Sequence, residues 1–70
     1  DYSAMGDSVA LITAVIAGDQ MANYSAADRQ ACVDRNVEHL EFMVALDDWG
    51  SEDMTATNAA ISAGNGYTAS

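Results

Sequence analysis

The chain has 70 residues, of which two are Arg, none is Lys and eleven are Asp or Glu, so its net charge is −9. A chain of this length forms one domain with a small core. Half of the residues are hydrophobic, but fourteen of these are Ala and only eleven are Val, Leu or Ile. Because a core of this size contributes only about 3–5 kcal/mol to the free energy of unfolding, we expect a partner or a second copy to add stability.

The charge and the apolar runs exclude two classes of partner. Phosphate backbones and anionic membrane surfaces attract clustered Lys and Arg, and this chain has only Arg29 and Arg35. The longest dense apolar run, Val9 to Ala17, is half of the roughly 20 residues that a membrane-spanning helix needs. Cys32 is the only cysteine, so the chain forms no internal disulfide. We therefore expect neither direct nucleic-acid binding nor membrane contact.

A first helix is predicted over approximately residues 4–17. Proline is absent and Ala, the best helix former, is the most abundant residue, which favours helix throughout. Large apolar residues recur here at steps of +4, +3 and +4, which places them on one face of a helix. These residues are Met5, Val9, Ile12 and Ile16. Gly18 follows at the position where a left-handed C-terminal cap belongs.

A second helix is predicted over approximately residues 26–48. Ser25 followed by Asp28 resembles a capping box, with Asp in place of the usual Glu. The apolar stripe again has steps of +4, +3 and +4 and consists of Val33, Val37, Leu40 and Val44. Trp49 and Gly50 are expected to end this helix, with Trp49 covering the end of the bundle.

A third helix is predicted over approximately residues 52–63, with Ser51 as its cap and a loosely ordered C-terminal tail. Gly64 either ends this helix or allows another backbone to approach closely. Three helices joined by short connections predict a single domain over residues 1–70, an all-α small antiparallel three-helix bundle. Its expected core is Val9, Ile12, Ile16, Val33, Val37, Leu40, Val44 and Ile61.

The residues that could carry chemistry do not form a known site. Cys32 and His39 are two helical turns apart, and no second Cys or His exists to complete a tetrahedral metal site. Glu38 and Glu41 neighbour His39 in sequence but point elsewhere on the helix. The Gly64–Gly66 segment follows a helix, whereas a phosphate-binding loop follows a strand. We therefore expect no enzyme activity, no metal and no cofactor.

Phe42 is the residue that the bundle does not explain, since it lies about 180° from Val33 on the helical wheel. Arg35, His39 and Leu46 lie on the same side as Phe42. An exposed aromatic beside a leucine and an arginine has the composition of a small protein–protein interface. The predicted partner interface is thus Arg35, His39, Phe42 and Leu46. The alternative is that a neighbouring helix covers Phe42 and makes it part of the core.

A family resemblance is carried by Ala31–Trp49, ACVDRNVEHLEFMVALDDW, and by Asp53–Gly64, DMTATNAAISAG. Its most distinctive part is Asp34–Glu41. These runs, about half of the chain, resemble small helical proteins encoded by tailed phages of marine bacteria. The resemblance implies a phage accessory protein in the virion, such as a capsid-decoration, tail or adaptor subunit, and it brings no catalytic activity with it.

Two function classes follow from this. The first is a non-enzymatic structural or accessory subunit of a phage virion that contacts capsid or tail proteins, further copies of itself, or both. The alternative is an acidic phage effector that masks a nucleic-acid-binding protein in the host cytoplasm during infection. A mimic of nucleic acid needs carboxylates in closely spaced rows, whereas those of this chain are dispersed. The dispersed charge favours the structural subunit.

Overall fold

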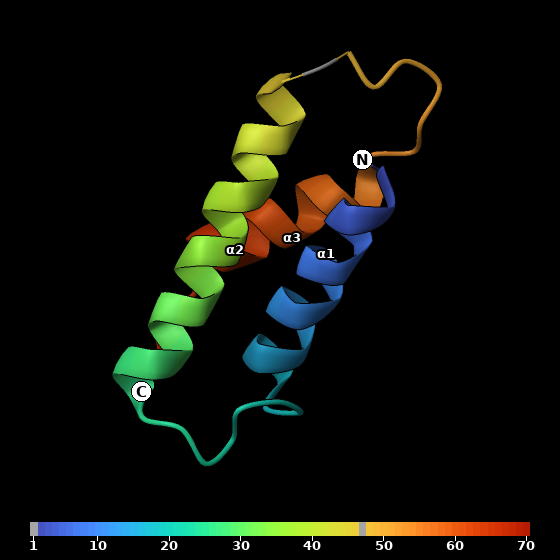
Figure 1. The fold of residues 1–70 in the computed structure, drawn as a ribbon. Helices are drawn as coiled ribbons and strands as arrows, with labels where there is room; N and C mark the ends of the chain where they lie inside the picture. Colours follow the sequence, from blue (N-terminus) through green and yellow to red (C-terminus); the bar gives the residue numbers. More distant parts are fainter. Residues whose placement is uncertain (1, 47) are drawn as a thin grey trace.

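The computed structural model describes residues 2–46 and 48–70 and contains the helices α1 (Tyr2–Ala17), α2 (Ala26–Leu46) and α3 (Thr55–Asn65). Helices α1 and α2 lie side by side and run in opposite directions, and α3 crosses behind them (Figure 1). Each helix packs against both of the others. The fold is therefore the predicted all-α three-helix bundle, with extents of 38 × 17 × 17 Å. None of its described helices is both long and apolar enough to cross a membrane.

Helix α1 ends at Ala17, as predicted, because Gly18 adopts a left-handed backbone conformation with φ +83°. The N–H of Gly18 donates to the carbonyl of Val15 at 3.2 Å, and the N–H of Asp19 donates to the carbonyl of Ala14 at 2.9 Å. Together these two bonds form a Schellman cap, which satisfies carbonyls that the last helical turn leaves unpaired. Gly18 thus has the capping role that its position in the sequence predicts.

Helix α2 begins at Ala26, as predicted, and the hydroxyl of Ser25 accepts a hydrogen bond from the N–H of Asp28 at 3.1 Å. The helix ends at Leu46 and not at residue 48, while Asp47 lies outside the described residues. The indole N–H of Trp49 donates to the carbonyl of Met43 at 3.1 Å. Trp49 lies beyond the end of α2 at Leu46, and its side chain therefore caps a carbonyl of the last helical turn.

Helix α3 begins at Thr55, later than the expected start at residue 52, because Asp53 and not Ser51 bonds to its first turn. The carboxylate of Asp53 accepts a hydrogen bond from the N–H of Thr55 at 3.0 Å. The carbonyl of Asp53 also accepts a bond from the hydroxyl of Tyr2 at 2.6 Å, which ties this helix start to the start of α1. At its other end α3 continues through Gly64 to Asn65, beyond the expected end at residue 63.

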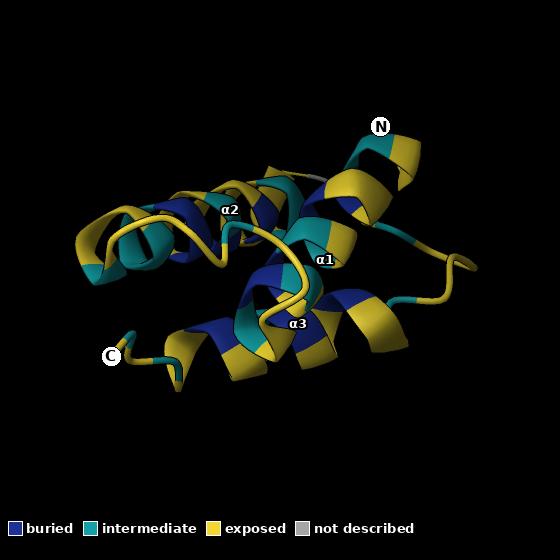
Figure 2. Cartoon of the chain, turned by 90° about the horizontal axis from the view of Figure 1, so that it is seen from below, coloured by how far each residue is buried: buried dark blue, intermediate teal, exposed yellow. Residues whose placement is uncertain are grey.

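The core lies where the three helices meet, and the buried segments in Figure 2 face this shared interior. Of the eight predicted core residues, four are buried and four are half-buried, and none is exposed. The half-buried ones are Val9, Ile16, Val44 and Ile61. The buried hydrophobic residues are Met5, Ile12, Val15, Cys32, Val33, Val37, Leu40 and Ala60. The apolar periodicity therefore locates the core correctly.

Gly64 lets α3 approach α2 closely. A β-carbon at this position would overlap the Cγ2 methyl group of Val37 and would lie 3.4 Å from the Cγ1 methyl group of Val33. Gly64 is itself buried. Because glycine has no side chain, the backbone of α3 rests directly on these two valines. Of the two roles that the sequence leaves open for Gly64, the structure shows the close approach.

The C-terminal tail beyond α3 is held against the start of α2, and Figure 1 shows the end of the chain beside that helix start. The side-chain amide of Gln30 donates to the carbonyl of Tyr67 at 3.1 Å and accepts from the N–H of Ala69 at 2.7 Å. Arg29 donates to the hydroxyl of Tyr67 at 3.3 Å and to the carbonyl of Ser70 at 2.7 Å. The tail is therefore fixed by these four bonds, which we call the tail clamp, and is not the loosely ordered segment that the sequence predicts.

Candidate functional site

The four residues of the predicted partner interface lie on one exposed face of α2. Arg35 and His39 are exposed, and Phe42 and Leu46 keep 62% and 63% of their surface accessible. Their spacing of +4, +3 and +4 projects them from the side of α2 that faces away from Val33. Because the described chain does not cover Phe42, the alternative in which it belongs to the core does not occur.

Three of the four residues surround a shallow hollow of about 410 Å³, together with Glu38. Leu46 lies one helical turn beyond Phe42, outside the hollow. Sequence reasoning missed Glu38, although it lies three residues after Arg35 and four before Phe42, a spacing that places all three on neighbouring parts of one helix surface. We call Arg35, Glu38, His39, Phe42 and Leu46 the α2 patch.

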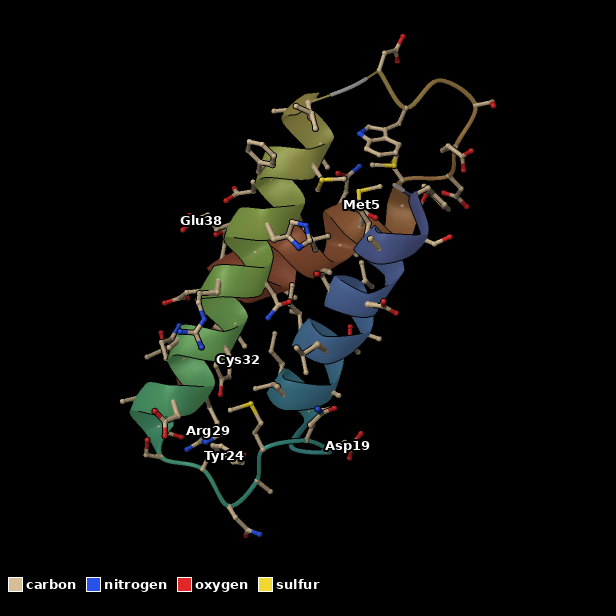
Figure 3. The ribbon with its side chains drawn as sticks, viewed as in Figure 1. Met5, Asp19, Tyr24, Arg29, Cys32 and Glu38 are labelled. Carbon is tan, nitrogen blue, oxygen red and sulfur yellow. The ribbon has the colours of Figure 1, made fainter. Side chains whose placement is uncertain are left out.

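Carboxylates follow one edge of the α2 patch. Asp34, Glu38 and Glu41 are exposed and have steps of +4 and +3, and Figure 3 shows Glu38 pointing away from α1. Arg35 forms no ion pair with another residue in the described part of the chain. The patch therefore offers one arginine, one carboxylate and the two large apolar side chains of Phe42 and Leu46 to a partner, a mixture that sets the orientation of that partner.

His39 is positioned by α1, because its Nδ1 lies 3.3 Å from the Oγ of Ser8. This contact fixes the imidazole ring at the line where α1 meets α2. A serine beside a histidine can act as a nucleophile with its base. Ser8 is only 5% exposed, however, so a substrate carbonyl cannot reach its hydroxyl. The geometry therefore makes Ser8 a positioning contact for His39.

The thiol of Cys32 is buried in the core, and Figure 3 shows its side chain on α2. Its neighbour is the amide of Asn36, whose nitrogen lies 2.8 Å from the carbonyl oxygen of Cys32 and 3.7 Å from its Sγ. The residues that the structure describes contain no group of three or more His, Cys, Asp or Glu placed to hold a metal ion. In the described part of the chain, this thiol is therefore not part of a metal-ligand set.

A second hollow, of about 350 Å³, lies between the end of α1 and the C-terminal tail. Its cation is Arg29, which Figure 3 shows near Tyr24 at the α1–α2 turn. The guanidinium donates to the carbonyl of Tyr24 at 3.3 Å, in addition to its two bonds in the tail clamp. Because three of its five N–H groups already bond to the chain, Arg29 holds the tail in place.

The fold and the α2 patch define a class: a small all-α three-helix bundle with one exposed face that is both apolar and charged. Comparison of the chain with protein-family models, with curated proteins and with solved structures finds no match in any of the three.

Proposed function

We propose that the protein is a non-enzymatic subunit that assembles with other protein chains through the α2 patch. The observation that carries this proposal is the exposure of Phe42 and Leu46, at 62% and 63%, on the outer face of a central helix. Because the core of the chain is small, leaving two large apolar side chains outside it forgoes stability that the fold could use. An apolar pair beside an exposed arginine is the composition that protein–protein interfaces favour.

The place of assembly that we propose is a phage virion, where the protein would serve as a capsid-decoration, tail or adaptor subunit. The support for this finer proposal is the resemblance carried by residues 31–49 and 53–64. The small bundle is consistent with a subunit that gains stability from its neighbours, because a core of this size leaves only a small margin. The proposed location is accordingly the virion, or the host cytoplasm during infection.

The test is the substitution Phe42→Ala, with Tyr24→Ala as its matched control. Tyr24 is an aromatic residue of similar exposure, 58%, but it lies in the α1–α2 turn, away from the patch. Phe42→Ala should leave the melting temperature of the isolated domain unchanged and weaken assembly into particles or oligomers by about 2 kcal/mol or more. Tyr24→Ala should change neither quantity.

Mass spectrometry of purified particles supplies the second readout. A stoichiometric copy number supports the virion subunit. Absence from particles, together with capture of a basic nucleic-acid-binding protein of the host, would favour the alternative of an acidic effector. A loss of melting temperature in Phe42→Ala equal to its loss of assembly would instead place Phe42 in the fold and refute the interface.

A further inference from the structure

The junction between α3 and the C-terminal tail contains a glycine that its backbone conformation does not require. Gly66 has φ −89°, which any residue adopts, and a β-carbon there would meet only backbone carbonyl oxygens at 3.7 and 3.8 Å, ordinary contact distances. Gly66 follows Asn65, which is exposed and is the last residue of α3. This is the only Asn–Gly step in the sequence. What the pair does provide is a reactive combination of side chain and backbone.

We propose that Asn65 is a site of spontaneous deamidation, and that the tail clamp controls the rate of this modification. A base removes the proton of the Gly66 N–H, and the nitrogen attacks the side-chain Cγ of Asn65. The N–Cγ bond forms, the Cγ–Nδ2 bond breaks, and the leaving nitrogen takes a proton from water and departs as ammonia. The inference goes beyond the proposed function and does not involve the α2 patch.

The product of this first step is a five-membered succinimide ring, which water then opens. Attack of water on Cγ breaks the N–Cγ bond and gives aspartate. Attack on the backbone carbonyl carbon of Asn65 breaks its bond to the Gly66 nitrogen instead and gives isoaspartate, in which the backbone runs through the former side chain. The net reaction is hydrolysis of one amide, so it needs only water and a base.

The sequence and the structure favour Asn65 over the other asparagines. Asn23 and Asn58 are also exposed, but the residue that follows each of them carries a side chain that hinders attack by its nitrogen. Asn36 is half-buried, and its amide nitrogen donates to a backbone carbonyl of its own helix at 2.8 Å. Gly66 offers no such hindrance, because glycine has no β-carbon and reaches conformations that other residues avoid.

The fold restrains the attacking nitrogen. The N–H of Gly66 donates to the carbonyl of Ser62 at 3.2 Å, and the N–H of Tyr67 donates to the carbonyl of Gly64 at 3.2 Å. While these bonds hold, the Gly66 nitrogen faces the helix and not the side chain of Asn65. Two of the four bonds of the tail clamp end on Tyr67, directly after Gly66. The reaction therefore proceeds from the fraction of molecules in which the clamp and the last turn of α3 are open.

Deamidation makes this opening more frequent. A new carboxylate at residue 65 lies at the C-terminal end of α3, where the helix dipole disfavours negative charge. Isoaspartate in addition lengthens the backbone by one methylene group within the turn that bonds Gly66 to Ser62. Tyr67, Thr68 and Ser70 line the hollow of about 350 Å³ beside the end of α1. A modified chain should therefore hold its tail less firmly and open this hollow.

Peptide mapping by mass spectrometry tests the site. The full chain is incubated in mildly alkaline buffer, and we expect Asn65 to lose its amide before the other three asparagines. Gly66→Ala should slow this loss severalfold and leave the melting temperature unchanged, because the structure has room for the methyl group. Earlier loss at Asn23 or Asn58 would overturn the proposal, as would an equal rate in Gly66→Ala.

Arg29→Met tests the control by the tail clamp. This variant loses the bonds to Tyr67 and Ser70, and deamidation at Asn65 should accelerate by about fivefold or more. Arg35→Met removes the same charge from the exposed face of α2 and should react at the rate of the wild type. In concentrated urea all three chains should react equally fast. Equal rates in buffer would refute the control, and a difference that persists in urea would do the same by assigning it to charge.

Asn65→Asp reproduces the aspartate product and tests its effect on the tail. Amide exchange at Ala69, which donates to Gln30, should accelerate by about two- to fivefold. Ala56→Asp is the matched control, since it adds the same charge in the first turn of α3, where the helix dipole favours it, and should leave this exchange unchanged. Equal exchange in the wild type and Asn65→Asp would show that the modification does not loosen the tail.

Discussion

At the scale of single residues, Gly64 sets how closely two helices pack. Its α-carbon rests on Val37 and Val33, and Ile12 of α1 lies near the same point, 3.7 Å from where a β-carbon would be. All three helices therefore depend on the absence of one side chain. The small core makes this contact matter more than it would in a larger domain, because a loss of a few kcal/mol is a large share of the total stability.

Gly64→Ala should destabilise the bundle by about 1–3 kcal/mol, since the new methyl group forces α3 away from Val37. Gly6→Ala is the matched control: Gly6 is exposed in α1 and a β-carbon there would meet nothing within 4 Å. This control should stabilise the domain by about 0.5–1 kcal/mol through helix propensity alone. Urea unfolding of both variants measures the difference. Equal effects of the two substitutions would contradict the close approach.

At the scale of elements, the start of α3 depends on one carboxylate. Hydrogen bonds from Thr55 hold the pKa of the Asp53 carboxyl below its ordinary value of 3.8. The backbone N–H of Thr55 has the larger effect and its side chain the smaller one. Since the folded-state pKa is lowered, the stabilisation is present at pH values above 3.8 and is lost as the pH falls through the folded-state pKa. The start of α3 should therefore weaken in acid.

Asp53→Asn tests this pH dependence, because an amide oxygen can still accept from Thr55 but does not titrate. We expect the wild type to lose melting temperature between about pH 4 and about pH 2 more steeply than Asp53→Asn does. Glu52→Gln removes the same charge next to Asp53 without touching Thr55, and it should keep the steeper acid dependence of the wild type. Parallel acid curves for wild type and Asp53→Asn would argue against a titrating contact.

The tail clamp is the second element whose role can be measured. Arg29→Met removes the bonds to Tyr67 and Ser70 and should cost about 1–2 kcal/mol, because hydrogen bonds to charged groups are the stronger ones. Amide exchange at Ala69, which donates to Gln30, should accelerate in the same variant as the tail detaches. Arg35→Met is the control, since Arg35 is exposed on the α2 patch, and it should change stability by less than about 0.5 kcal/mol. Unchanged exchange at Ala69 would count against the clamp.

The helices could be predicted because their apolar residues recur with a helical period, and Gly18 and Ser25 marked the α1–α2 junction, whereas the α2–α3 junction and the tail could not be predicted. The end of α2 is closed by a bond of Trp49 to Met43, only six residues earlier, which the apolar period does not reveal, and α3 begins where Asp53 bonds to Tyr2, 51 residues away in sequence. The tail was missed for the same reason, since Gln30 and Ala69 are 39 residues apart. Four residues of the α2 patch followed from spacing, but the contact of His39 with Ser8 depends on how α1 meets α2. Local patterns thus predict elements, and tertiary bonds decide their limits.

At the scale of the whole molecule, charge is distributed unevenly. All charged residues lie before Met54, so α3 and the tail present a neutral surface while α1, α2 and the connecting segments carry the net charge of −9. The α2 patch lies within the charged part, beside the exposed carboxylates of Asp34 and Glu41. Long-range steering of a charged partner therefore acts on the α2 side of the molecule and not on the α3 side.

The whole molecule should not depend on a metal ion for its fold. Because the described residues hold no suitable group of ligands, a chelator such as EDTA should leave both the helicity and the melting temperature unchanged. Circular dichroism with and without chelator measures both quantities, and a buffer of matched ionic strength is the control for the charge of the chelator. A shift of more than a few degrees beyond that control would show a metal site.

The end of the bundle at the α2–α3 connection contains a natural fluorescent reporter. Trp49 is the only tryptophan, and its ring lies 6.3 Å from the ring of Tyr2, tilted by 50°. Its fluorescence therefore senses the junction of the α2–α3 connection with the start of α1, while the tail clamp lies at the α1–α2 turn. Loosening of the tail should leave the emission spectrum unchanged, and a red shift should accompany separation of Tyr2 from Trp49. Fluorescence and Ala69 exchange thus report on the two ends of the molecule separately.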